Sequence, residues 1–114
     1  MEKIEFERKF KEANDTLDID FFKEEIRKSS EDLGVKNRLV IAMEEAAEFS
    51  QAVAKMYRGK PDRMNLIEEM ADMMICVESL KQIYHISDKE INKAINLKFD
   101  RGIKLSGQYN NWEE

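Results

Sequence analysis

Apolar residues recur every three or four positions along two long segments of the chain, which is the spacing of an amphipathic helix. The first segment covers residues 36–57, the second covers residues 62–84, and Gly59 and Pro61 interrupt the pattern between them. We expect one apolar stripe of each helix to face the core. The two stripes are Leu39, Met43, Ala46, Ser50, Val53 and Tyr57, and Leu66, Met70, Met73, Val77, Leu80 and Tyr84. The short connection between the segments predicts antiparallel neighbours.

Shorter helices are expected on either side of this pair. Residues 1–14 predict a charged amphipathic helix, and a second helix begins near Asp18 or Asp20, either of which can cap it, and ends before Gly34. Residues 87–90 read Ser-Asp-Lys-Glu, which is typical of a capping box that opens a fifth helix to about residue 104. Because β-branched residues never form an alternating run, the fold class is predicted to be all-α.

The chain length predicts one domain, since 114 residues fall within the usual range. Its core is expected over residues 34–104, preceded by the N-terminal helices of residues 1–33 and followed by a loose polar tail, 106–114, which carries Trp112. An antiparallel helical bundle fits this arrangement. With only two long amphipathic helices, the chain has reason to complete its core by dimerisation. The four methionines in and beside the second apolar stripe suit either adaptable core packing or a dimer seam.

Charge and cysteine content narrow the choice of partners and compartment. The net charge is −5 and no basic block stands out, so duplex nucleic acid is not expected as a partner. A single cysteine, Cys76, allows no disulfide within the chain and favours the cytoplasm. The N-terminus does not resemble a signal peptide, and no apolar run approaches the ~18 residues of a membrane span.

Two acidic clusters carry the most specific signal for chemistry. Residues 44–48 read Glu-Glu-Ala-Ala-Glu and residues 68–72 read Glu-Glu-Met-Ala-Asp. On helices, this spacing places pairs of carboxylates beside the apolar stripe, so antiparallel packing would make four of them converge. Two carboxylates about 5 Å apart repel by about 3 kcal/mol at an effective dielectric near 20, so protonation, basic neighbours or divalent cations must compensate. Oxygen ligands without histidine favour Mg²⁺ or Mn²⁺.

The same carboxylates also allow other interpretations. Taken singly, each glutamate fits an ordinary solvated helix face. A di-iron bundle would need a histidine three residues after a glutamate, and the only histidine, His85, has none at that distance. The register also stays open, because Glu44 and Glu48, like Glu68 and Asp72, are one helical turn apart.

The ordered pair of clusters with a spacer of about twenty residues resembles the signature of MazG-like nucleotide pyrophosphohydrolases, members of the all-α NTP pyrophosphatase superfamily. The resemblance covers residues 34–104. It implies Mg²⁺-dependent cleavage of nucleoside triphosphates to a monophosphate and pyrophosphate by a metal-activated water. It also implies the metal ligands, which are Glu45, Glu48, Glu69 and Asp72. Glu48 or Glu44 would accept the proton of the water.

The resemblance further implies a homo-oligomer, either a dimer or a tetramer, and basic residues for the triphosphate. Lys93, Lys98 and Arg101 on the fifth helix are the expected phosphate-binding residues, and Lys55 follows the first cluster. Lys36 and Arg38 are weaker candidates. Two rivals remain, namely a related hydrolase acting on dUTP or phosphoribosyl-ATP, and a non-catalytic helical interaction or regulatory protein with the same fold.

Overall fold

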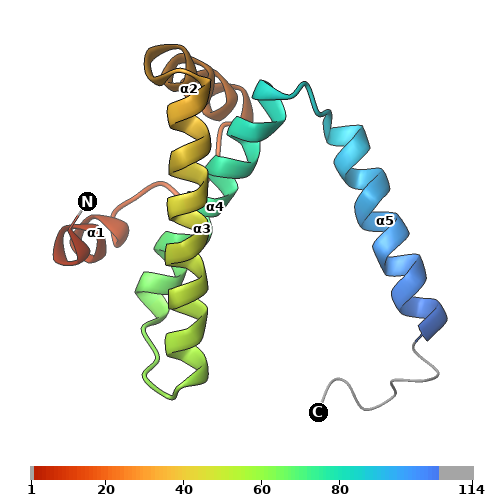
Figure 1. Ribbon diagram of the computed structural model, residues 1–114. Helices are drawn as coiled ribbons and strands as arrows, with labels where there is room; N and C mark the ends of the chain where they lie inside the picture. Colours follow the sequence, from red (N-terminus) through yellow and green to blue (C-terminus); the bar gives the residue numbers. More distant parts are fainter. Residues whose placement is uncertain (1, 106–114) are drawn as a thin grey trace. The chain divides into compact units, whose positions relative to one another are not determined.

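The computed structural model describes the backbone of residues 2–105 and the side chains of residues 2–100. Within these residues the chain forms five helices and no strand (Figure 1), so the prediction of an all-α fold is confirmed. The helices are α1 (Lys3–Phe10), α2 (Ile19–Leu33), α3 (Val35–Tyr57), α4 (Arg63–Ile83) and α5 (Asp88–Leu105). The predicted loose tail with Trp112 lies outside the described residues.

Side-chain hydrogen bonds explain where the first two helices end and begin. Helix α1 ends at Phe10, earlier than the sequence predicts, and further on the Asn14 side chain accepts a hydrogen bond from the Thr16 N–H at 2.9 Å. Such a bond offers the backbone an alternative to the helix. Asp18 caps α2 by accepting a hydrogen bond from the Phe21 N–H at 3.0 Å, which decides between the two predicted caps.

Helices α3 and α4 form an antiparallel hairpin, as predicted (Figure 1). Gly59 takes a positive φ of 76° in the connection, where a side chain would be strained. Asp62 then caps α4 by accepting a hydrogen bond from the Asn65 N–H at 3.1 Å, and it also pairs with Lys3 of α1. Helix α2 packs against both members of the hairpin, and α1 packs against α4.

The chain divides into two compact units. The first contains α1 to α4 and ends at Ile83, and the second begins at Tyr84 and contains α5. In the second unit the Ser87 hydroxyl accepts a hydrogen bond from the Glu90 N–H at 3.1 Å, and a Glu90 carboxylate oxygen lies 3.5 Å from the Ser87 N–H. This is the capping box that the sequence predicts.

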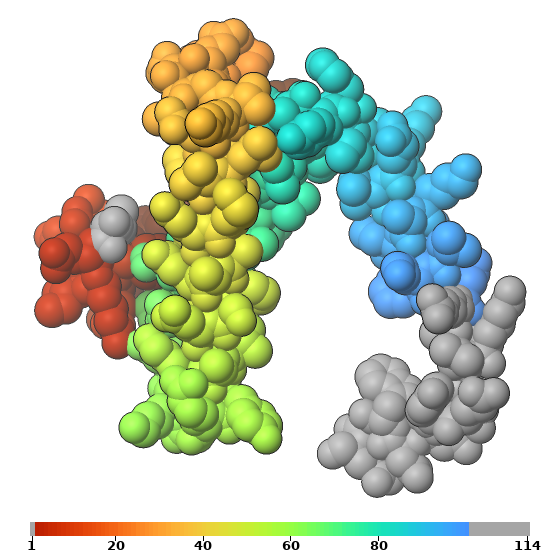
Figure 2. All heavy atoms as spheres, viewed as in Figure 1, coloured from red at the N-terminus to blue at the C-terminus, as the bar shows by residue number. Residues whose placement is uncertain are grey.

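The face along which α3 and α4 pack is not the one that the apolar pattern predicts. The predicted core stripe is largely exposed, with Met43 65% and Tyr57 90% accessible. The buried residues of the seam between the two helices are instead small or polar: Ala52, Cys76, Ser79, Arg38 and Glu69. Small side chains let the helix axes approach closely, which displaces the bulky stripe to the side of the seam. No other helix of the first unit covers the face of α3 seen in Figure 2.

Candidate metal centre

The carboxylates of α3 and α4 meet in the seam between these helices. Glu45, Glu48 and Glu69 each offer a carboxylate oxygen, and the three atoms lie within 4.8 Å of one another. Asp72 lies close to them, because its charge adds to the effect of burial in raising the pKa of Glu45. The predicted convergence of two acidic clusters is therefore present. We call Glu45, Glu48, Glu69 and Asp72 the acidic centre.

Two oxygens of the acidic centre are buried and have no hydrogen-bond partner among the described residues. They are Oε2 of Glu45 and Oε2 of Glu69. A buried acceptor without a partner costs free energy, so native proteins rarely keep one without a ligand or a function. Both oxygens therefore point to something that the protein atoms themselves do not supply.

The crowding of negative charge changes the proton affinity of the centre. Burial, followed by the charges of Asp72, Glu48 and Glu69 and by the hydrogen bond with Asp72, raises the pKa of Glu45 to about 7. Burial is also the first cause of the raised pKa of Glu69, where the charges of Glu48 and Asp72 add to it. Glu68, at the edge of the centre, has a raised pKa for the same reasons, chiefly burial and then Asp72. Near neutral pH the centre thus holds charge that protons or a cation must neutralise.

The donor set fits a hard divalent cation. Each ligand in the group of three is a carboxylate oxygen, which Mg²⁺ and Mn²⁺ prefer. A soft atom close to the centre is the thiol of Cys76, which is buried and on which the charge of Glu45 acts. Burial and the charge of Glu45 raise the pKa of this thiol, so it stays protonated and is a poor ligand for zinc.

Not every predicted acidic residue joins the centre. Glu44 is exposed and lies outside the group of three carboxylates, although the spacing from Glu44 to Glu48 is one helical turn. Glu48 is exposed but belongs to the group. The geometry therefore favours the register that starts at Glu45, one of the two that the sequence leaves open.

The predicted phosphate-binding residues differ in what the structure says of them. Lys55 of α3 is exposed and lies close enough to lower the pKa of Glu69, against the stronger effect of burial. Lys93 and Lys98 are exposed on α5, in the second unit, and Lys93 lines a shallow pocket on that helix. The side chain of Arg101 lies outside the described residues. A phosphate role for these three residues of α5 stays a prediction.

Two residues that the sequence analysis undervalued lie in the same seam. Arg38 is buried, and its Nε donates a hydrogen bond of 2.9 Å to the Ser79 hydroxyl. Arg38 precedes Glu45 by seven residues and Ser79 follows Asp72 by seven. Seven residues are two helical turns, so this spacing was a signal that both belong to the carboxylate face. For Arg38 this spacing was not taken as a sign of burial, because an isolated arginine is usually exposed.

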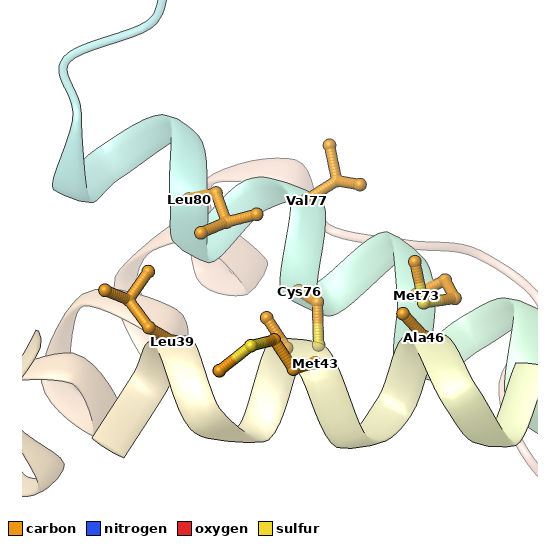
Figure 3. A pocket seen from close by; sticks show the side chains of 8 residues that line it. Leu39, Met43, Ala46, Met73, Cys76, Val77 and Leu80 are labelled. Atoms are coloured by element: carbon orange, nitrogen blue, oxygen red, sulfur yellow. The ribbon is translucent and has the colours of Figure 1, made fainter. Parts of the chain in front are cut away.

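An apolar groove lies between α3 and α4, alongside the seam (Figure 3). Figure 3 shows Leu39, Met43 and Ala46 reaching it from α3, and Met73, Val77 and Leu80 from α4. The groove has a volume of about 440 Å³, and it is formed by the stripes that the sequence analysis assigned to the core. Its bulky side chains are therefore available for packing against something else.

None of the described helices has the length and apolar character needed to cross a membrane. Comparison of the chain with protein-family models, curated proteins and solved structures found no match. The site must therefore be interpreted from its own geometry, and the resemblance to MazG-like enzymes stays a prediction.

Proposed function

We propose that the chain is a Mg²⁺-dependent nucleoside triphosphate pyrophosphohydrolase, which cleaves a nucleoside triphosphate to the monophosphate and pyrophosphate. The observation that carries the proposal is the group of Glu45, Glu48 and Glu69, whose oxygens lie within 4.8 Å of one another. Two of these residues keep a buried oxygen without a protein partner. Such a centre suits a hard dication, and a dication suits a polyphosphate.

The residues of the acidic centre differ in exposure, which suits them to two different roles, metal binding and proton transfer. Glu45, Glu69 and Asp72 lie in the seam and would hold the metal. When bound, Mg²⁺ neutralises phosphate charge and lowers the pKa of a coordinated water. Glu48 is exposed and stands at the edge, where its carboxylate can accept the proton of a water that attacks the α-phosphorus. Pyrophosphate then leaves, and no covalent intermediate is needed.

Basic residues must complement the phosphates that the metal does not neutralise. Lys55 is suited to this role, because its charge already acts on Glu69. Lys93, Lys98 and Arg101 of α5 are the other proposed phosphate-binding residues, on the grounds of the resemblance. Mn²⁺ is expected to replace Mg²⁺, since both prefer carboxylate oxygens.

The apolar groove supports a further part of the proposal, namely that the protein is a homo-oligomer, a dimer or a tetramer. Met43 and Val77 lie in the groove with 65% and 45% of their surface exposed. A second hairpin packed on this face would complete a four-helix core and bury both residues. Burying apolar surface contributes about 25 cal/mol per Å², which makes so open a face unfavourable in a lone chain.

The same groove also favours a second candidate function, that of a non-catalytic helical interaction or regulatory protein. An exposed apolar face is what a partner helix would bind. This candidate predicts neither Mg²⁺ binding at the acidic centre nor turnover. A hydrolase for dUTP or phosphoribosyl-ATP differs from the main proposal only in its substrate.

The deciding experiment measures pyrophosphate release from a panel of ribo- and deoxyribonucleoside triphosphates, together with dUTP and phosphoribosyl-ATP, with and without Mg²⁺. In parallel, binding of Mn²⁺ is followed by electron paramagnetic resonance for the wild type and for Glu69→Gln. The proposal predicts Mg²⁺-dependent release and a weaker Mn²⁺ signal change in the variant. Absence of turnover together with unchanged Mn²⁺ binding in the variant would favour the interaction protein.

A further inference from the structure

Arg38 is a buried arginine without a carboxylate partner. Only 8% of its surface is exposed, and its Nε is used by the hydrogen bond to the Ser79 hydroxyl. Within the described part of the chain, the guanidinium forms no ion pair, and its other two nitrogens have no hydrogen-bond acceptor. A buried charge is normally paired, because removing it from water is costly. The two terminal nitrogens of Arg38 are not among the fully buried polar atoms without a partner, so these donors are open to an acceptor that comes from a ligand.

Arg38 lines a pocket of about 330 Å³ that we call the Arg38 pocket. Its wall is mostly apolar and partly aromatic, with Leu17, Phe21 and Phe22 contributed by the start of α2 and the residues before it, and Ile75 by α4. Glu25 also borders the pocket, but its carboxylate faces Lys28 at 3.6 Å. A flat apolar ligand with hydrogen-bond acceptors on one edge matches this lining.

Helical spacing relates the Arg38 pocket to the acidic centre. On α3, Arg38, Glu45 and Glu48 belong to one stripe, and on α4 Glu68, Asp72 and Ile75 do the same. The apolar groove is lined mainly by the neighbouring stripe of each helix, which includes Met43 and Val77. Seven residues of helix separate Arg38 from Glu45, which is about 10 Å along the axis. A nucleotide spans its base, sugar and phosphates over a comparable length.

Cys76 links the two places in the seam. Burial is the main cause of the raised pKa of its thiol, and the charges of Glu45 and Arg38 also act on it, the first raising and the second lowering that pKa. The acidic centre and the Arg38 pocket are thus neighbours along one seam, with one buried side chain between them.

We propose that the Arg38 pocket is the base subsite of the nucleotide and that Arg38 selects bases with two adjacent acceptors on one edge. The inference rests on the proposed function. Guanine offers O6 and N7, and cytosine offers O2 and N3. Arginine has donors and no acceptor, so the edge of adenine, where a donor stands beside N7, is a mismatch. In uracil and thymine a ring N–H separates the two carbonyl oxygens, so the paired donors of Arg38 meet a donor.

The aromatic residues supply the second part of the recognition. Phe21 is 64% exposed at the mouth of the pocket, where its ring can stack on a base. Because Phe21 contributes little to the buried core, its removal tests the pocket without disturbing the fold.

The test uses nucleosides, which carry no phosphate and need no metal. Binding of guanosine, cytidine, adenosine and uridine to the full chain is followed by NMR chemical-shift titration without Mg²⁺. We expect guanosine and cytidine to bind about ten-fold more tightly than adenosine and uridine. Arg38→Lys keeps the charge but loses the paired donors, so it should remove the preference. Phe21→Ala should weaken the binding of all four nucleosides. Lys11→Met, an exposed change away from the pocket, should weaken the binding of none.

The outcomes separate this inference from the proposed function. Base-selective binding that disappears in Arg38→Lys, without turnover of any triphosphate, would keep the subsite and reject the hydrolase. Turnover without base preference, unaltered in Arg38→Lys, would keep the hydrolase and reject the subsite. Equal binding of the four nucleosides, or no binding, also rejects the subsite. If circular dichroism shows that Arg38→Lys loses helix, Phe21→Ala decides, and unchanged binding in that variant rejects the subsite.

Discussion

The carboxyl group of Glu45 on α3 faces that of Asp72 on α4, across the seam in which the two helices pack, and after burial the charge of Asp72 is the largest cause of the raised pKa of Glu45. Two carboxylates this close repel each other unless a proton or a cation intervenes. The same pairing of positions repeats two helical turns further along the seam. Arg38 lies seven residues before Glu45 and Ser79 lies seven residues after Asp72, and these two residues are joined by a hydrogen bond. Closing of the hairpin therefore brings together negative charges that a proton or a dication would neutralise.

The stability of the metal-free protein should fall as the pH rises from about 5 to 7.5. The pKa of Glu45 is raised from 4.5 to about 7 in the folded chain. Between these values the folded state holds more protons than the unfolded state, so the free energy of unfolding decreases with increasing pH. The raised pKa values of Glu68 and Glu69 act in the same direction. The measurement is the thermal midpoint in the presence of a chelator at several pH values.

Glu45→Gln provides the control for this pH dependence. The variant removes the carboxyl group with the largest effect, so its thermal midpoint should change much less over the same range. Glu12→Gln, an exposed change of the same kind outside the seam, should keep the wild-type slope. A slope that is equally steep in Glu45→Gln would show that the acidic centre is not its source.

The helices and the acidic pairs could be predicted because they depend on local rules. Asp18, Asp62 and Ser87 cap helices through bonds to residues three positions away, so their effect is visible in a short window of sequence. The pairing of Glu45 with Glu48 follows from helical spacing alone. Their approach to Glu69 needed only the further assumption of an antiparallel hairpin.

The buried face could not be predicted in the same way, because it depends on how closely two helices approach. The apolar pattern selected the stripe with Met43 and Val77, whereas the helices pack through Ala52, Cys76 and Ser79. Hydrophobicity ranks the bulky residues first, but close packing of helix axes favours small ones. Arg38 was undervalued for a related reason, since its partner Ser79 is forty-one residues away in the sequence.

Glu48→Gln should lower turnover by about 10²- to 10⁴-fold, the usual contribution of a general base. The side chain is exposed, so helix content and oligomeric state should stay unchanged. The measurement is pyrophosphate release under saturating Mg²⁺, with circular dichroism and light scattering on the same samples. Glu12→Gln is again the matched control. Wild-type turnover in Glu48→Gln would remove this residue from the mechanism, and a larger loss in Glu44→Gln would transfer the role of base to Glu44.

Val77→Asp should weaken self-association by about ten-fold or more, because a charge in an apolar contact loses its water without gaining a partner. Val77 lines the apolar groove and is 45% exposed, so the fold of the lone chain should tolerate the change. Sedimentation velocity over a concentration series measures the effect. Ile4→Lys, which changes an exposed apolar residue of α1, should leave association unaltered. Equal association of the wild type and Val77→Asp would argue against a second copy on the groove.

Alkylation of Cys76 should be slow in the native protein and slower still when Mg²⁺ is present. The thiol is buried between α3 and α4, and burial together with the charge of Glu45 raises its pKa, so little reactive thiolate forms. A reagent must wait for the hairpin to open, and a dication held by Glu45 and Glu69 would oppose that opening by mass action. Mass spectrometry of iodoacetamide-treated samples over time gives the rate. Because this readout needs no nucleotide, it tests metal binding separately from catalysis. In Glu69→Gln, which loses one of the ligands, the protection by Mg²⁺ should be largely lost, and a Mg²⁺ effect of the same size in both proteins would place the cation elsewhere.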